Sequence, residues 1–353
     1  MSDIQPVWVI KDTRFLRHLE RMPHMESSKR ITAAFTLLED DSLQGRYRIV
    51  PPRPASAEEL ALVHTPEHIR RVAASLGKPL TSFDLDTQAT EVSYEIACLG
   101  VGAVFSLLDE IWRAGSGRGF AFVRPPGHHA GPDKAMGFCL FNNIALGARY
   151  LQRRHRVEKI MIVDLDAHHG NGTQTAFYDD DSVLYFSMHQ YPAYPGTGNL
   201  AEVGRGKGEG FTVNVPLPKG CGDRDFAQVM YFLLKPIAEA FKPEMMLVSC
   251  GFDLYRRDPL CRMGATSEGY ALMTFLLLEL AERICAGRIA FVMEGGYSLK
   301  GIRECGLRVM QVLCGIPTVG TKTISRFLGA NAKRLSLFKK IIEIQRPYWP
   351  QLV

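Results

Sequence analysis

The stretch Val163-Asp-Leu-Asp-Ala-His-His-Gly-Asn-Gly172 carries the most information about the fold, because an apolar run leads directly into two carboxylates and two imidazoles. Residues 160–163 are continuously apolar, as in a buried parallel strand. In open α/β sheets, ligands bind just beyond the carboxyl ends of such strands. Asp166 and His168 lie two residues apart, so in an extended chain both side chains leave the same face and can converge on one ion. Taken alone, the pattern fits a polar turn after a core strand equally well.

Three further apolar runs also stop at reactive side chains. They are residues 120–123 before His128 and His129, residues 245–248 before Asp253, and residues 289–293 before Tyr297. Burying charged groups is costly unless they are paired or bound to a metal. Core packing alone does not explain four such endings, so the sequence predicts a functional site where the strands end.

The regular alternation of helical and strand patterns predicts an α/β protein with a parallel sheet. Strands are expected at the four apolar runs and at two further segments, 183–188 and 211–215. Helices are expected at 56–63, 66–75, 91–114, 142–154, 223–241 and 266–286.

Composition limits the class of protein. The 353 residues are 46% hydrophobic, and no Pro/Gly/Ser-rich linker or charge block divides them, so we expect one domain spanning residues 1–353. The eight cysteines include no Cys-x-x-Cys pair, which argues against a thiolate zinc cluster or a disulfide framework and favours a cytoplasmic protein. Met1-Ser-Asp-Ile-Gln lacks the pattern of a signal peptide, and no apolar run reaches the ~18 residues of a membrane span. The net charge of +5 is too small to indicate nucleic-acid binding.

Seven motifs make the chain resemble the zinc-dependent histone deacetylases, most closely the class II-like bacterial histone deacetylase-like amidohydrolases. In the order of that family, they are Arg124-Pro-Pro-Gly-His-His-Ala130, Gly137-Phe-Cys-Leu-Phe-Asn-Asn143, Asp164-Leu-Asp-Ala-His-His-Gly-Asn-Gly-Thr-Gln174, Tyr194-Pro-Gly-Thr-Gly198, Gly251-Phe-Asp253, Asp258-Pro-Leu260 and Glu294-Gly-Gly-Tyr297. The resemblance implies the arginase/deacetylase fold, a single catalytic domain with a central parallel sheet of about eight strands flanked by helices. It also implies a hydrolase that removes acetyl or other short acyl groups from lysine side chains of peptides or proteins.

The donor types indicate one catalytic metal ion. Asp166, His168 and Asp253 would leave a position open for water, as catalytic zinc requires. Arginases share the fold, but their two-manganese site needs two further carboxylates, and this chain has Gly170 and Tyr255 in those places. We therefore expect a single Zn²⁺, with iron or cobalt as alternatives.

The resemblance implies a role for each catalytic side chain. His129 would act as general base and then as general acid, with His128 as its electrostatic partner. Asp164 would lie behind His128 and Asn171 behind His129. Because residue 171 is Asn, as in class II members, rather than the Asp of class I, we expect His129 to be less strongly polarised. Tyr297 would stabilise the tetrahedral oxyanion.

The resemblance further implies a substrate tunnel and a structural cation, K⁺. Tunnel residues would be Gly137, Phe138, Tyr194, Leu260 and Asp86, with Arg30 at an internal acetate channel. The cation would be held by Asp164 and by main-chain oxygens around Asp166, His168, Ser187 and Met188.

Leu260 bears on the substrate, because acetylpolyamine deacetylases of the family carry a Glu gatekeeper at the matching position. Leucine favours an acyl-lysine in a peptide or protein over a polyamine. An acetylpolyamine or other small amide is the alternative substrate, and a catalytically silent acyl-lysine binder is a further alternative. The sequence leaves the oligomeric state open, including a homo-oligomer.

Overall fold

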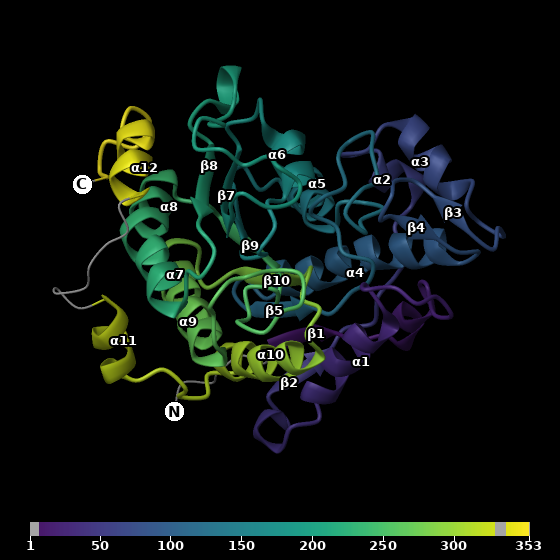
Figure 1. The fold of residues 1–353 in the computed structure, drawn as a ribbon, viewed down its shortest axis with the longest axis horizontal. Helices are drawn as coiled ribbons and strands as arrows, with labels where there is room; N and C mark the ends of the chain where they lie inside the picture. Colours follow the sequence, from purple (N-terminus) through teal and green to yellow (C-terminus); the bar gives the residue numbers. More distant parts are fainter. Residues whose placement is uncertain (1–6, 329–336, 353) are drawn as a thin grey trace.

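The computed structural model describes residues 7–328 and 337–352, and within them eight strands form one sheet (Figure 1). The strands are β1 Val7–Ile10, β2 Tyr47–Ile49, β5 Arg118–Ala121, β6 Ile160–Asp164, β7 Val183–Gln190, β8 Thr212–Leu217, β9 Met245–Cys250 and β10 Ile289–Met293. Their order is β2-β1-β5-β10-β9-β6-β7-β8, and every neighbouring pair is parallel. The predicted α/β fold is therefore confirmed. A separate antiparallel pair consists of β3 Thr81–Ser82 and β4 Gln88–Ala89.

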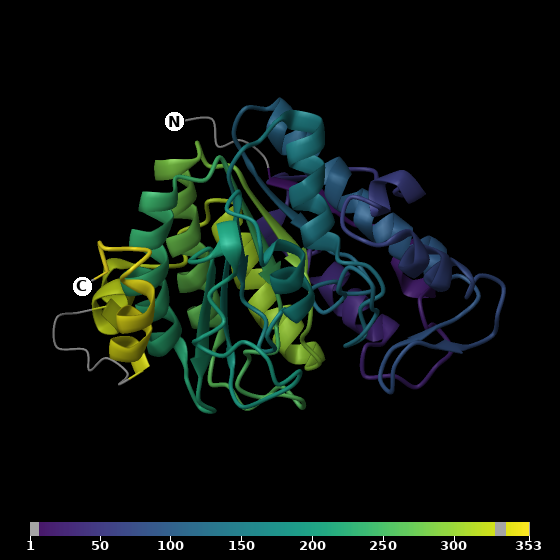
Figure 2. The same cartoon turned by 90° about the horizontal axis from the view of Figure 1, so that it is seen from above.

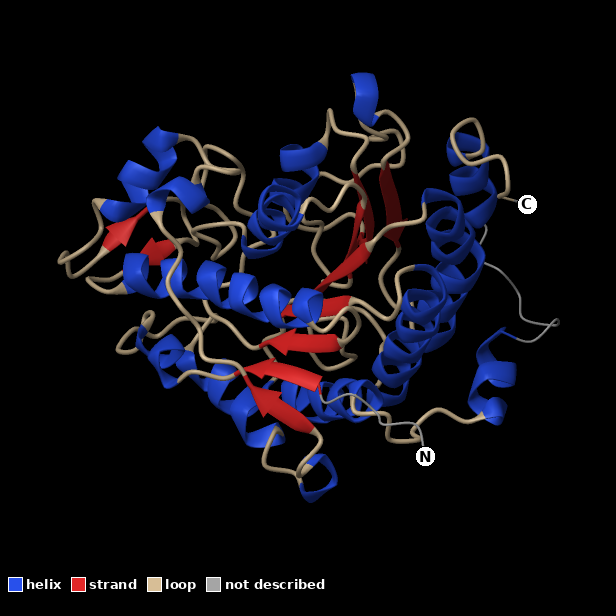
Figure 3. Cartoon of the chain, turned by 180° about the vertical axis from the view of Figure 1, so that it is seen from behind, coloured by secondary structure: helices blue, strands red, loops and turns tan. Residues whose placement is uncertain are grey.

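Helices cover both faces of the sheet, as Figures 2 and 3 show. One layer contains α4 Ser93–Arg113, α5 Asn143–His155 and α6 Asn171–Phe177, which pack on one another and on the strands. The opposite layer contains α1 Ser28–Leu37, α7 Asp223–Val229, α8 Lys235–Phe241, α9 Ser267–Ile284 and α10 Leu299–Leu313. The remaining helices are α2 Ala57–Leu60, α3 Pro66–Ala73, α11 Thr321–Leu328 and α12 Leu337–Gln345. The two layers bury the sheet on both sides, which explains why its strands are continuously apolar.

The order of the strands brings the predicted site residues to one edge. After β6, the chain adds β7 and β8 outward and then returns, so that β9 and β10 fill the space between β6 and β5. The four strands with reactive endings, β5, β10, β9 and β6, are thus consecutive in the sheet. Because they are parallel, their carboxyl ends meet where ligands bind in open α/β sheets.

A cluster of stacked phenylalanines lies in the centre of the core. The ring of Phe120 on β5 stacks on Phe122, on Phe291 of β10 and on Phe252 after β9, with centroid separations of 4.0, 5.9 and 6.3 Å. All four side chains are buried completely. The cluster fixes the strands whose ends carry the reactive side chains.

Side-chain caps explain where several helices begin. The side-chain oxygens of Asn142, Thr266 and Ser298 accept hydrogen bonds from backbone N–H groups in the first turns of α5, α9 and α10, at 3.0, 3.3 and 3.1 Å.

Two helix predictions were wrong in detail. The helix predicted at 223–241 is interrupted by a π-helical segment, Met230–Leu234. Pro236 follows it and lacks the N–H group that a regular helix needs, which accounts for the irregularity. At 56–63, only Ala57–Leu60 is helical. The sequence analysis missed the strands β1, β2, β3 and β4 and the helices α1, α6, α10, α11 and α12, and it placed β5 two residues too late.

Residues 1–5, used above to argue against a signal peptide, lie outside the described residues. In the described part of the chain, no helix combines the length and the apolar character needed to span a bilayer.

Phe120→Ala should lower the free energy of unfolding by about 3–5 kcal/mol, because it removes a ring from a packed core. Urea unfolding followed by circular dichroism measures the change. Leu85→Ala is the control, because Leu85 is 98% exposed, and its effect should stay within about 0.5 kcal/mol. Equal losses in the two variants would contradict a central role for the cluster.

Candidate active site

Two carboxylates and an imidazole meet beyond the ends of β6 and β9. Asp166 and His168 follow β6, and Asp253 follows β9. The Nδ1 atom of His168 lies 3.1 Å from Oδ1 of Asp166 and 3.1 Å from Oδ2 of Asp253. Both carboxylates are completely buried. The structure thus brings together the three residues that the sequence analysis proposed as metal ligands.

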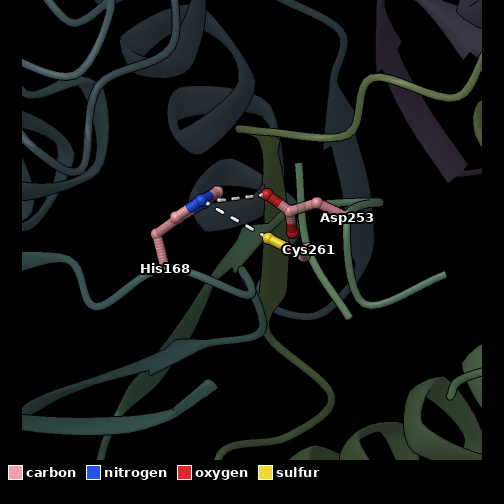
Figure 4. A group of neighbouring side chains, drawn as sticks. All are labelled: His168, Asp253 and Cys261. Atoms are coloured by element: carbon pink, nitrogen blue, oxygen red, sulfur yellow. Dashed lines mark hydrogen bonds and ion pairs between the residues drawn. The ribbon is translucent and has the colours of Figure 1, made fainter. Parts of the chain in front are cut away.

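A thiol that the sequence analysis did not predict lies on another side of the same imidazole. The Sγ atom of Cys261 is 3.4 Å from Nε2 of His168, and potential ligand atoms of His168, Asp253 and Cys261 lie within 4.8 Å of one another (Figure 4). The two nitrogens of an imidazole point in different directions, and both carboxylates face Nδ1. One ion on Nδ1 would be reached by Asp166 and Asp253, whereas Cys261 would serve as the outer partner of Nε2. The carboxylate set is therefore the better fit for a metal ion.

The charge balance of this cluster also fits a cation. The ion-pair partners of Asp166 and Asp253 among the described residues are imidazoles, with no lysine or arginine. Burial and the negative charge of Asp166 raise the pKa of Asp253 to about 7. Two adjacent buried carboxylates are costly unless a positive charge compensates for them. A divalent ion would supply that charge.

Glycines make room for this arrangement. A Cβ atom at Gly251 would overlap the carboxylate of Asp166, and one at Gly295 would overlap the carboxylate of Asp253. The N–H group of Gly295 also donates to Oδ2 of Asp166 at 2.8 Å. The backbone after β9 and β10 therefore lies so close to the carboxylates that only glycine fits at these two positions.

The surroundings of the adjacent imidazoles of His128 and His129 shift their pKa values in opposite directions. Burial would lower the pKa of His128, but the negative charges of Asp166 and Asp164 outweigh burial and raise that pKa to about 10. Burial and the positive charges of His128 and His168 hold the pKa of His129 well below its usual range. These surroundings favour the charged form of His128 and the neutral form of His129.

Each imidazole has an acceptor behind it, as the sequence analysis expected. Nδ1 of His128 lies 3.1 Å from Oδ2 of Asp164, and Nδ1 of His129 lies 2.8 Å from Oδ1 of Asn171. Because a carbonyl oxygen only accepts hydrogen bonds, Nδ1 of His129 is the donor. The lone pair of the neutral ring is then on Nε2, which is the arrangement that a general base needs.

Glu294 holds the backbone of the loop that carries His128 and His129, a role that the sequence analysis did not assign. Its Oε2 atom accepts the N–H groups of Gly127 at 2.6 Å and His128 at 3.2 Å. Burial raises the pKa of Glu294 to about 7.

His129, His168 and Tyr297 open into one pocket of about 240 Å³. Its lining consists of Asp86, His129, Gly137, Phe138, His168, Tyr194, Leu260 and Tyr297. The pocket is narrow at Gly137, whose φ is +58° and where a Cβ atom would overlap the ring of His129. Oδ1 of Asp86 accepts the N–H group of Gly137 at 3.2 Å. Five of the six predicted tunnel residues thus surround a single pocket.

Arg30, the sixth, is not among the residues that line this pocket. It is buried behind Tyr297, with its guanidinium group 4.9 Å from the ring centroid of that tyrosine. Its Nη2 and Nε atoms donate to the carbonyl oxygens of Glu294 at 2.5 Å and Gly296 at 2.6 Å, and Nη1 donates to Glu26 at 2.7 Å. Here Arg30 supports the loop that carries Tyr297, and its part in an acetate channel stays a prediction.

The residues predicted to hold K⁺ lie on β6, on β7 and in the turn after β6. Asp164 pairs in register with Ser187, and Met188 follows on β7. The carboxylate of Asp164 also accepts the hydroxyl of Tyr185 at 2.9 Å and the N–H group of Asp166 at 3.1 Å. The potassium ion stays a prediction.

Comparisons with known proteins agree with this geometry. Residues 24–313 match the model of the histone deacetylase domain. The chain therefore belongs to the histone deacetylase family, whose members are hydrolases that act on amides.

Three similar proteins illustrate the range of this family. The histone deacetylase-like amidohydrolase of Pseudomonas aeruginosa is 38% identical over 294 residues, which cover 83% of this chain and 77% of that protein. The human protein named polyamine deacetylase HDAC10 is 38% identical over 340 residues, 93% of this chain but 50% of the relative. The crystal structure of the HDA15 HD domain superposes with a TM-score of 0.88 at 37% identity, covering 99% of this chain and 96% of that one.

Asn171→Asp should move the acidic limb of the kcat/KM profile to higher pH. A carboxylate 2.8 Å from Nδ1 would stabilise the imidazolium form of His129 and raise its pKa, so the base would become protonated at a higher pH than in the wild type. A pH series on an acylated lysine peptide measures the shift. An acidic limb that stays in place, or moves to lower pH, would contradict the role of His129 as the base.

Proposed function

We propose that this chain is a single catalytic domain, residues 1–353, that removes acetyl or other short acyl groups from lysine side chains of peptides or proteins. The observation that carries the proposal is geometric: the ring of His129, whose Nδ1 atom is bonded to Asn171, lines one pocket together with Tyr297 and the proposed metal ligand His168. A hydrolase that cleaves an amide needs a base for water, an acid for the leaving amine and a donor for the oxyanion.

Asp166, His168 and Asp253 would hold one Zn²⁺ ion, and this assignment is supported by their geometry and by the two buried carboxylates, which have no lysine or arginine partner among the described residues. When bound, zinc would lower the pKa of water and polarise the acyl carbonyl group. We keep K⁺ as the proposed structural cation near Asp164.

The residues of the chain itself would carry the proton transfers. Nε2 of His129 accepts a proton from the attacking water, while the bond from Nδ1 to Asn171 holds the ring in place. As the C–N bond breaks, the same Nε2 atom donates that proton to the nitrogen of the leaving lysine amine. The charged His128 stabilises the negative charge that develops nearby.

Tyr297 would supply the oxyanion donor. Burial raises the pKa of its phenol well above the usual range, so the hydroxyl keeps its proton at neutral pH. Among the described residues, no hydrogen-bond partner of this hydroxyl is found, which leaves it free for a substrate oxygen.

The mouth of the pocket favours an acyl-lysine over a polyamine. Leu260 is 42% exposed there and offers no charge to an ammonium group. Arg256 and Arg257 on the same loop are exposed and would repel a polycation. Phe138 and Tyr194 suit the methylene chain of a lysine. An acetylpolyamine stays the alternative, because a polyamine deacetylase is among the relatives.

We also propose a cytoplasmic location, because the eight cysteines, all within the described residues, are free and buried. The proposed partner is an acylated peptide or protein, with no role for nucleic acid or membrane. Homo-oligomerisation stays open.

The substrate is tested by comparing kcat/KM for acetyl-, propionyl- and butyryl-lysine peptides with that for acetylputrescine and acetylspermidine. We expect the peptides to be cleaved faster, and Leu260→Glu to shift the preference toward the polyamines by introducing a charge that attracts an ammonium group. Faster cleavage of the polyamines by the wild type would favour the alternative substrate.

Tyr297→Phe in the same assay separates catalysis from binding. The loss of one oxyanion donor should lower kcat by ~10²–10³-fold. Peptide binding without turnover in both proteins would favour a silent binder.

A further inference from the structure

The side chain of Asp258 links two walls of the pocket that come from different parts of the chain. Its Oδ2 atom accepts the N–H groups of Tyr297 at 2.7 Å and Ser298 at 3.1 Å, and its Oδ1 atom accepts the N–H group of Leu260 at 2.9 Å. Asp258 is 8% exposed, and no lysine or arginine forms an ion pair with it among the described residues. All three hydrogen bonds are made to the backbone. A single carboxylate therefore holds the residue at the rim and the tyrosine at the bottom of the pocket.

The backbone of Tyr297 is anchored on both sides. Two residues earlier, the N–H group of Gly295 donates to Asp166, one of the proposed metal ligands, at 2.8 Å. Between the two anchors, Gly296 has a φ of +108°, and a Cβ atom there would crowd Phe252. This glycine gives the loop conformational freedom that a larger residue would remove. The bonds to Asp258 restrict that freedom at the position of Tyr297.

The ring contacts of Tyr297 do not replace this anchor. The guanidinium group of Arg30 lies 4.9 Å from the ring centroid, and Phe138 makes an edge contact at 5.8 Å between centroids. Neither contact is a hydrogen bond that would fix the direction of the ring. A tilt of the backbone at Tyr297 would displace the hydroxyl, which is the atom farthest from the Cα.

The position of Asp258 at the start of α10 supports the same role. Ser298 caps this helix, and its side chain accepts the N–H group of Gly301 at 3.1 Å. The N–H groups of Tyr297 and Ser298 lie immediately before the first turn, where backbone donors lack partners within the helix and the helix dipole favours a negative charge. Asp258 satisfies both donors and connects Tyr297 to the rigid end of a 15-residue helix.

We propose that Asp258 is a positioning residue that fixes the Tyr297 hydroxyl for oxyanion stabilisation and couples its position to the rim at Leu260. This role rests on the function proposed above, in which Tyr297 is the oxyanion donor. Such a hydrogen bond depends strongly on placement, because a displacement of about 1 Å can cost ~10²-fold in rate. Contacts made to Tyr297 through its backbone would thus control kcat without touching the substrate.

A double-mutant cycle tests the proposal. Asp258→Asn keeps the size of the side chain but replaces one acceptor oxygen with an NH₂ group, so it cannot accept all three hydrogen bonds. We expect kcat on an acetyl-lysine peptide to fall by about 10- to 100-fold, within the loss that a displaced catalytic group produces. KM and the zinc content should stay close to those of the wild type. In a Tyr297→Phe background, the same substitution should change kcat by less than about twofold, because the hydroxyl it positions is already absent.

Asp223→Asn is the matched control. Asp223, the first residue of α7, also connects its segment to the start of another helix, α9, since its carboxylate accepts the N–H and hydroxyl groups of Thr266 at 2.7 Å each, but it does not line the pocket. This variant should keep the wild-type kcat. An equal fall in kcat in this control would indicate a general loss of stability and overturn the proposal.

Two further outcomes would overturn the positioning role alone. They are an unchanged kcat in Asp258→Asn, and a fall in kcat of the same factor with and without the Tyr297 hydroxyl. A Tyr297→Phe enzyme with wild-type kcat would instead overturn the proposed function, and the positioning role with it. Asp258→Ala should show a larger fall than Asp258→Asn, and if it fails to fold, the asparagine variant carries the test.

Discussion

Two buried carboxylates, Asp166 and Asp253, share one imidazole nitrogen and have no lysine or arginine partner among the described residues, and the rest of the site depends on this constraint. Such a pair is stable only if a cation joins it or if one carboxylate takes up a proton. The fold brings the two carboxylates together by placing β6, β9 and β10 side by side. Gly251 and Gly295 then allow the backbone to approach both carboxylates. The pair of carboxylates that is costly to bury is therefore also the proposed metal site.

The charges around the site also give the neighbouring histidines, His128 and His129, different proposed roles. His128 faces the carboxylates of Asp164 and Asp166, which raise its pKa, whereas His129 faces the neutral amide of Asn171 and has a lowered pKa. The surroundings of two chemically identical side chains thus shift their pKa values in opposite directions. Divergent pKa values in adjacent groups are typical of sites that carry out acid and base catalysis.

The sequence predicted the site residues that can be recognised by the type of their side chain. It missed the roles of residues that act by binding backbone N–H groups. Apolar runs that end in Asp, His or Tyr predicted the sheet and the cluster at its edge. The strands β1 and β2, of four and three residues, and the seven-residue helix that follows the Asp-Ala-His-His motif are too short to give a clear periodic pattern, and they were missed. Asp258 and Glu294 act by accepting backbone N–H groups, which leaves no spacing in the sequence to recognise. Cys261 was missed because an isolated cysteine carries no ligand pattern, and the role of Arg30 at a channel stays a prediction.

Metal content per chain tests the central claim most directly, because it separates the carboxylate set from the thiol. Elemental analysis of purified wild type, Asp166→Asn, Asp253→Asn and Cys261→Ser after equilibration with Zn²⁺ gives the number of bound ions. We predict about one zinc per chain in the wild type, as expected for one catalytic site. Zinc should be retained in Cys261→Ser and lost in both asparagine variants. Loss of zinc in Cys261→Ser, with zinc retained in Asp166→Asn, would contradict the account.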